Sequence, residues 1–340
     1  MLQLSYHKHT SIFKTPGGTS RGVLHSKDSW ILSLCDTRQP NVIGTGEVSI
    51  IENLSIDSPP LMENQLDWLC THINDDYVTL MSELIDFPAI QFGLETAFLD
   101  LKTGGKQILF PSDFTTGTKG IPMNGLVWMG SFGQMHHQLK EKLATGFTCI
   151  KIKVGAIDFE QELNLLKQIR QEFSPEEIEI RVDANGAFPV NEAEEKLKQL
   201  SNYRLHSIEQ PIKQGQWEKM AGLCNKNILP IALDEELIGI TTEKATLLDT
   251  IKPQYIILKP SLLGGLHQSE QWVKLAEDRS IGWWATSALE TNVGLNAIAQ
   301  WTAIQNNPMP QGLGTGQLFT NNFPSPLEVR NGELWHEKIH

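Results

Sequence analysis

The stretch Ile150-Lys-Ile-Lys-Val-Gly155 (IKIKVG) decides the fold. Its β-branched residues alternate with two lysines and a glycine closes it, a pattern typical of a β-strand. Side chains on a strand alternate between its two faces, so Lys151 and Lys153 point to one face and the branched residues to the other. Burial and the like charge of the neighbour both lower a lysine pKa, which favours a lysine that accepts a proton. A strand with a solvated lysine face is the alternative, and the downstream sequence decides between the two.

From about residue 122 onward, strand-like runs alternate regularly with helical stretches. This alternation predicts a parallel sheet, and about eight units in roughly 190 residues indicate a closed barrel of the TIM type. An open doubly wound sheet is the alternative, which is weakened because no G-x-G-x-x-G follows an early strand. The expected strands are 124–129, 148–154, 178–184, 205–209, 229–234, 254–259, 282–287 and a short 311–314, with helices at 158–172, 190–200, 264–279 and 292–305.

The first hundred residues lack this regular alternation, and their pattern predicts an α+β unit. Strands are expected at 29–35 and 46–51 and helices at 61–74 and 88–103. Glycines at positions 17, 18, 44 and 46 are expected to mark turns. The loop 14–21 either covers a site or forms a plain flexible hairpin.

Composition excludes several classes of protein. The 340 residues are 40% hydrophobic without an apolar run of 18, so no segment is expected to span a membrane, and the first residues are not expected to act as a signal peptide. Four cysteines stand alone at 35, 70, 149 and 224, which argues against a zinc site or disulfide scaffold and favours the cytoplasm. A net charge of −12 argues against nucleic acid or an anionic membrane as a partner.

Three acidic residues end three consecutive expected strands. Asp183 lies in IEIRVDANG with Arg181 and Asn185 on the same face, and Glu209 and Asp234 end the next two strands. Residues at the C-terminal ends of barrel strands converge on one mouth. Three carboxylates there cannot all ionise unless a cation balances them, and hard oxygen ligands suit Mg²⁺. Any one of them alone could be an ordinary helix cap.

Lys259 ends the following strand after an apolar run, so it is also expected at the mouth. Lys151 and Lys153 precede the acids around the barrel and Lys259 follows them. Lysines on either side of a metal site suit removal of a proton α to a carboxylate, because the cation stabilises the charge that develops while a lysine takes the proton.

The ordered set K-x-K, D-x-N, E-x-P, D-E and K-P-x-x-x-G-G resembles the enolase superfamily, in particular its muconate-lactonising subgroup. The resemblance implies a modified (β/α)₇β TIM barrel, residues 113–317, with an N-terminal α+β capping domain, residues 1–112, on which residues 318–340 pack. It also implies Mg²⁺, with Mn²⁺ as a substitute, on Asp183, Glu209 and Asp234. Lys153 would be the base, with Lys151 as its pKa-lowering neighbour and Lys259 on the opposite face.

Within this subgroup the chain most resembles the o-succinylbenzoate synthases. The stretches that carry the resemblance surround Asp183 or lie at 286–294 and 312–319, which implies substrate contacts from Asn185, Arg181, Ser287, Gly312 and Gly314. The implied reaction is dehydration of 2-succinyl-6-hydroxy-2,4-cyclohexadiene-1-carboxylate to 2-succinylbenzoate in menaquinone biosynthesis.

Two other functions stay open at this point. A dipeptide epimerase or N-acylamino acid racemase would use lysines on both faces, but such epimerases generally carry D-x-D where this chain has Gly312-Leu-Gly314. A non-catalytic scaffold is disfavoured because every lysine and carboxylate is present. Glu290 either supports the site or begins a helix, and the sequence does not decide which. Oligomeric state is likewise open.

Overall fold

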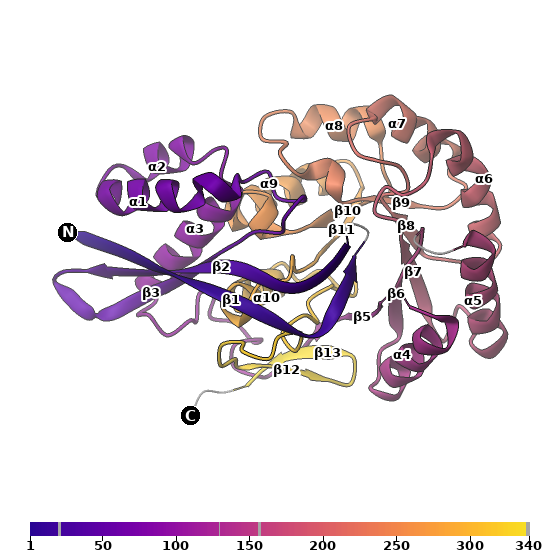
Figure 1. Ribbon diagram of the computed structural model, residues 1–340, viewed down its shortest axis with the longest axis horizontal. Helices are drawn as coiled ribbons and strands as arrows, with labels where there is room; N and C mark the ends of the chain where they lie inside the picture. Colours follow the sequence, from indigo (N-terminus) through magenta and orange to yellow (C-terminus); the bar gives the residue numbers. More distant parts are fainter. Residues whose placement is uncertain (20–21, 129, 156–157, 338–340) are drawn as a thin grey trace.

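A curved sheet of seven parallel strands dominates the computed structural model, which describes residues 1–340 except 20–21, 129, 156–157 and 338–340 (Figure 1). Each strand pairs with the next one in the chain, as expected for successive β-α units. The strands are β5 (Asn124–Val127), β6 (Cys149–Lys153), β7 (Glu179–Asp183), β8 (Ser207–Glu209), β9 (Ile231–Leu233), β10 (Tyr255–Leu258) and β11 (Gly282–Ala285).

Two residues close this sheet into a barrel. Gln311 bridges to Met123 and Gly312 bridges to Thr286, both in parallel orientation. The backbone N–H of Asn124 donates to the Gln311 carbonyl at 2.9 Å, which joins the closing segment to the start of β5. The eighth strand is therefore only this pair of bridges. The predicted barrel is confirmed, and the open doubly wound sheet is excluded.

Helices surround the barrel and bury the branched face of each strand. Ile150 and Ile152 on β6 are fully buried in the main apolar core, while Lys151 and Lys153, which alternate with them, point inward. On α5, Leu163 and Leu166 pack into the same core. The helices are α4 (Phe132–Ala144), α5 (Phe159–Glu172), α6 (Val190–Ser201), α7 (Trp217–Lys226), α8 (Lys244–Ile251), α9 (Leu266–Glu277) and α10 (Asn292–Ile304).

The N-terminal unit has a separate apolar core between one sheet and three helices. Its sheet is antiparallel, with β1 (Leu2–Thr19), β2 (Gly22–Asp36) and β3 (Gln39–Ser49), and its helices are α1 (Met62–His72), α2 (Tyr77–Glu83) and α3 (Pro88–Lys102). We propose residues 1–112 as the capping domain because this core is distinct from the barrel core.

Gly44 and Gly46 do not mark a turn, contrary to the prediction. Both lie within β3, where the α3 backbone approaches the strand. A Cβ at Gly46 would lie 1.9 Å from the Gly93 carbonyl oxygen, and a Cβ at Gly44 would lie 2.1 Å from that of Ala97. Glycine is needed here for close helix–strand packing rather than for chain reversal.

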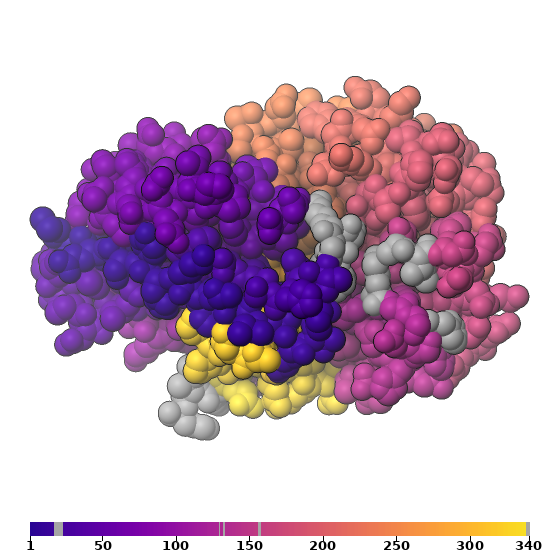
Figure 2. Space-filling view, in the orientation of Figure 1, coloured from indigo at the N-terminus to yellow at the C-terminus, as the bar shows by residue number. Residues whose placement is uncertain are grey.

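The C-terminal segment divides between the two units, which corrects the expectation that residues 318–340 pack on the capping domain. Lys14 N donates to the Leu318 carbonyl at 2.8 Å, and Thr320 N donates to that of Ile12 at 2.9 Å, so this part pairs with β1. The yellow segment lies beside the indigo hairpin in Figure 2. Further on, β12 (Leu327–Arg330) and β13 (Glu333–His336) form a small sheet with β4 (Ile121–Pro122), at the start of the barrel.

Candidate active site

Strand register brings the predicted catalytic and metal-binding side chains together. Lys153 on β6 is paired with Asp183 on β7, which is paired with Glu209 on β8. These residues therefore lie side by side across three strands, at their C-terminal ends. Asp234 follows β9 and Lys259 follows β10. The convergence predicted from strand ends is present in the structure.

Each of the three acids accepts a hydrogen bond from a lysine. Lys153 Nζ lies 2.6 Å from Asp183 Oδ2, and Lys151 Nζ lies 2.9 Å from Glu209 Oε2. Lys259 Nζ donates to Asp234 Oδ2. All three carboxylates are buried, so these ion pairs are shielded from water. Three lysines and three acids thus form one buried charge cluster.

The pKa of Lys151 shifts opposite to the predicted direction. Burial by itself lowers this pKa, but the Glu209 and Asp183 carboxylates together outweigh burial and hold it above the usual lysine range. The pKa of Lys259 is also raised, because Asp234 and Glu209 outweigh burial. Strand pairing places these acids beside Lys151 and Lys259, and their charge has the opposite effect to burial and a neighbouring lysine, on which the prediction was based.

The acids have the chemistry of a site for a hard cation. Burial and the nearby Asp183 charge raise the pKa of Glu209 to about 8, and Glu209 Oε1 has no hydrogen-bond partner among the described residues. A divalent cation would satisfy that oxygen and relieve the repulsion. Within the described part of the chain, no three His, Cys, Asp or Glu side chains are arranged around one point as metal ligands, because each of the three acids is bound to a lysine.

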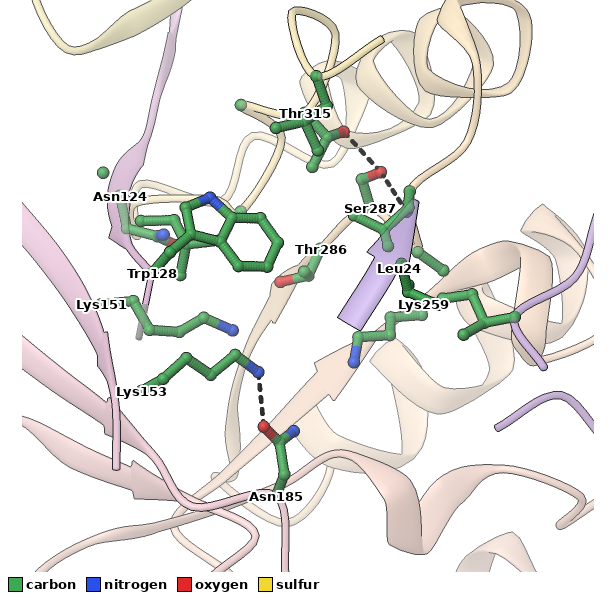
Figure 3. Close-up of a pocket in the computed structure, with 18 of the residues that line it drawn as sticks. Leu24, Asn124, Trp128, Lys151, Lys153, Asn185, Lys259, Thr286, Ser287 and Thr315 are labelled. Atoms are coloured by element: carbon green, nitrogen blue, oxygen red, sulfur yellow. Dashed lines mark hydrogen bonds between the residues drawn. The ribbon is translucent and has the colours of Figure 1, made fainter. Parts of the chain in front are cut away.

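A cavity of about 550 Å³ opens above this cluster, between the barrel mouth and the capping domain. The Lys151, Lys153 and Lys259 side chains line it, and Figure 3 shows their amino groups pointing into it from two sides. The capping domain contributes Val23 and Leu24 at the start of β2, together with residues 51–54. Of the expected 14–21 loop, residues 20–21 lie outside the described residues, and residues 14–19 belong to β1.

Four of the five predicted substrate-contact residues line this cavity: Asn185, Ser287, Gly312 and Gly314. Asn185 Oδ1 accepts a hydrogen bond from Lys153 Nζ at 2.6 Å, and its Nδ2 donates to Glu235 Oε1 at 3.0 Å. Asn185 therefore orients Lys153 from the side away from Lys151. The Ser287 hydroxyl accepts a hydrogen bond from Thr315 Oγ1 at 2.7 Å.

Arg181, the fifth, is not among the residues that line the cavity, which corrects that part of the prediction. Its guanidinium is buried inside the barrel, 4.2 Å from the Trp284 ring and 2.8 Å from Glu179 Oε1. Arg181 shares a face with Asp183 but precedes it by two residues, so it lies one layer deeper. The alternation of side chains specifies the face of a strand and leaves depth undetermined.

Sequence reasoning missed several residues of the cavity wall. Glu235 directly follows Asp234, and this second acid was a signal that could have been used. Trp128 follows β5, and its backbone N–H is held by the Gln138 side chain from α4 at 2.9 Å. Thr286 and Thr315 also face the cavity, and no local pattern distinguishes them from other threonines.

Comparison with known proteins agrees with this geometry. Residues 134–338 match the protein family described as Enolase C-terminal domain-like. The chain is 50% identical to an o-succinylbenzoate synthase of Desulfotalea psychrophila, over 98% of both chains. The chain belongs to the o-succinylbenzoate synthase family of the enolase superfamily. Members of this family are enzymes, and the predicted superfamily and subgroup are confirmed.

Solved structures share this fold at both high and low sequence identity. The crystal structure of MenC from Desulfotalea psychrophila matches with a TM-score of 0.88 and 47% identity, over 98% of this chain and 99% of that one. An L-Ala-D/L-Glu epimerase from Bacillus subtilis matches with a TM-score of 0.85 but only 18% identity over 98% of this chain and 95% of that one, which shows a shared fold alone. No helix among the described residues has the length and apolar character needed to cross a membrane.

Proposed function

We propose that this chain is an o-succinylbenzoate synthase that dehydrates 2-succinyl-6-hydroxy-2,4-cyclohexadiene-1-carboxylate to 2-succinylbenzoate. The observation that carries the proposal is one cavity with Lys153 and Lys259 on different sides, each bound to a buried carboxylate, in a chain 50% identical over its length to an enzyme of that name. Family membership supports the choice of reaction, because a barrel fold by itself does not specify chemistry.

The proposed cofactor is Mg²⁺, with Mn²⁺ as a substitute, held by Asp183, Glu209 and Asp234. The partnerless Glu209 oxygen and the raised Glu209 pKa support this donor set. The ion would neutralise the substrate carboxylate and so favour loss of the neighbouring proton. Mg²⁺ suits a set of carboxylate oxygens that leaves room for water and substrate.

Within this site, we assign each lysine a separate task. Lys153 removes the proton α to the carboxylate, and its ammonium then donates that proton to the hydroxide that leaves from the same face. Lys151 stays charged, with its Nζ 2.9 Å from Glu209 Oε2 and 3.3 Å from Asp183 Oδ2. Lys259 remains a cation and stabilises the negative charge that develops on the substrate. Asn185 orients Lys153 through its side-chain oxygen.

The test is to incubate the protein with the cyclohexadiene substrate and Mg²⁺ and to measure formation of the aromatic product by its ultraviolet absorbance. Wild-type protein should form the product, and Lys153→Arg should not, because a guanidinium is too weakly acidic to give up its proton and serve as a base. Product formation by Lys153→Arg at the wild-type rate would exclude Lys153 as the base. Absence of product with the wild-type protein would reject the function.

The epimerase alternative has little support. An L-Ala-D/L-Glu epimerase of Francisella tularensis subsp. novicida is 26% identical over 63% of this chain, and Gly312-Leu-Gly314 offers no carboxylate for a substrate ammonium. We further propose a place in menaquinone biosynthesis, a small carboxylate as the partner molecule, and the cytoplasm as the location. The location is supported by the four cysteines, none of which forms a disulfide in the described structure.

A further inference from the structure

One carboxylate of the capping domain binds the start of a barrel helix. Glu47 lies on β3 and is fully buried. Its Oε1 accepts from Ser29 Oγ and from Thr291 N, both at 2.9 Å. Its Oε2 accepts from Thr291 Oγ1 at 2.6 Å and from Gly294 N at 2.9 Å. Three of these four donors belong to the N-terminus of α10, where free backbone N–H groups and the helix dipole favour a negative charge.

The residues just before α10 form part of the cavity wall. Ser287, Ala288 and Leu289 all line the cavity. Leu289 has a φ of 63°, a left-handed conformation that is strained for a bulky side chain and persists only where surrounding contacts hold it. Glu290 is fully buried and supplies some of those contacts, since it accepts from Ser287 Oγ at 2.5 Å and from Ala288 N at 2.8 Å. This settles the open question of Glu290, which supports the wall.

A buried lysine of the capping domain joins the same hydrogen-bond network. Lys27 donates to Ser29 Oγ at 3.3 Å and also to Ser49 Oγ. Ser29 in turn donates to Glu47, so a continuous chain of hydrogen bonds runs from Lys27 to the start of α10. The 287–291 wall is thus held from within the barrel by Glu290 and from the capping domain by Glu47.

We propose that Glu47 is a positioning residue for the active site. By binding the first turn of α10 it holds the 287–291 wall, and with it the Ser287 hydroxyl, in the geometry that the reaction requires. The capping domain then influences turnover as well as enclosing the substrate. The kinetic part of this inference rests on the proposed function, whereas the hydrogen bonds and the order of the wall do not.

Glu95 on α3 offers a matched control. It also comes from the capping domain and also binds the N-terminus of a barrel helix, because it accepts from Leu266 N at 2.6 Å and His267 N at 3.0 Å at the start of α9. Neither Leu266 nor His267 lines the cavity. Glu95→Gln therefore makes the same chemical change as Glu47→Gln at the same kind of interdomain contact, away from the 287–291 wall.

The experiment compares Glu47→Gln with Glu95→Gln by hydrogen exchange and by steady-state kinetics with the cyclohexadiene substrate and Mg²⁺. Glu47→Gln should speed amide exchange over residues 287–294 and lower kcat by about tenfold to a hundredfold, with a smaller change in KM, because a small misplacement of the wall is felt in the reacting geometry. Glu95→Gln should change exchange only near residues 266–268 and leave kcat unaltered.

Wild-type exchange over residues 287–294 together with wild-type kcat in Glu47→Gln would overturn the proposal, as would an equal loss of kcat in both variants. A wild-type protein without synthase activity would reject the proposed function, and the exchange result would still decide the role of Glu47. If Glu47→Gln does not fold, Thr291→Val removes one donor to Glu47 and keeps the carboxylate. Thr291→Val should show the same two changes, faster amide exchange over residues 287–294 and a lower kcat, but to a smaller extent. Unchanged exchange and kcat would count against the proposal.

Discussion

Replacement of Lys259 by methionine separates the electrostatic role of this residue from proton transfer. The Lys259 side chain is 12% exposed and faces the cavity, so its charge is only weakly screened by water. The attraction between two opposite unit charges about 4 Å apart, here the Lys259 ammonium and the charge that develops on the substrate, is about 4 kcal/mol at an effective dielectric constant near 20. In bulk water it is about 1 kcal/mol. Because each 1.36 kcal/mol of activation free energy changes the rate about tenfold, removal of the Lys259 charge can lower kcat by about a thousandfold at most. We expect Lys259→Met to lower kcat by about 10²- to 10³-fold, as removal of one oxyanion-stabilising group does elsewhere.

Lys259→Arg is the partner variant, since it keeps the charge but cannot exchange a proton at neutral pH. It should retain measurable dehydration activity if Lys259 acts only as a cation. The assay is the initial rate of aromatic product formation at saturating substrate. Wild-type kcat in Lys259→Met would refute the electrostatic argument. Incorporation of solvent deuterium at the α-carbon of a dipeptide, with no dehydration of the cyclohexadiene, would refute the synthase assignment.

A control is needed because any buried lysine affects folding. Lys244 on α8 is 4% exposed and donates to Gln271 Oε1 at 2.9 Å, but it does not line the cavity. Lys244→Met should therefore leave kcat unchanged even if it lowers the melting temperature. A comparable loss of kcat in Lys244→Met and Lys259→Met would show that the effect is one of folding.

Three further predictions follow from the site and its surroundings. EDTA should abolish activity, and Mg²⁺ or Mn²⁺ should restore it. Asp183→Asn, Glu209→Gln and Asp234→Asn should each lower the activity by a comparable amount. Full activity in metal-free protein would reject the proposed cation site. Replacement of residues 15–20 by a short Gly-Ser turn should raise KM more than it lowers the melting temperature, because the adjoining Val23 and Leu24 line the cavity, and an unchanged KM would count against this. Burial raises the pKa of Asp57 from 3.8 to about 7, so the folded protein binds this proton more tightly than the unfolded chain. The stabilisation from that proton is complete below pH 4 and is lost as the pH rises to about 7. In urea titrations, the free energy of unfolding of Asp57→Asn should therefore increase relative to that of the wild type across this pH range. A difference in stability that does not depend on pH would contradict the assignment.

The sequence alone specified the barrel and most of its charged cluster. Strand periodicity placed Lys151 and Lys153 on one face, and the position of Asp183, Glu209 and Asp234 at strand ends predicted that they meet. These inferences depend on rules that act over a few residues, because side-chain alternation and strand ends are local properties. The family resemblance depended on the same short motifs, and the comparisons confirmed it.

Only the tertiary structure decided which residues lie at which depth and what holds the cavity wall. Arg181 obeys the same alternation as Asp183, yet it lies below the cavity because it is two residues earlier on the strand. Gly44 and Gly46 look like turn residues in the sequence, but α3 packs against them. Glu47 contacts Thr291 across 244 residues of chain, and such a contact arises from the docking of two units. Docking produces no periodic pattern within either segment, so no local rule applied to either segment identifies the pair.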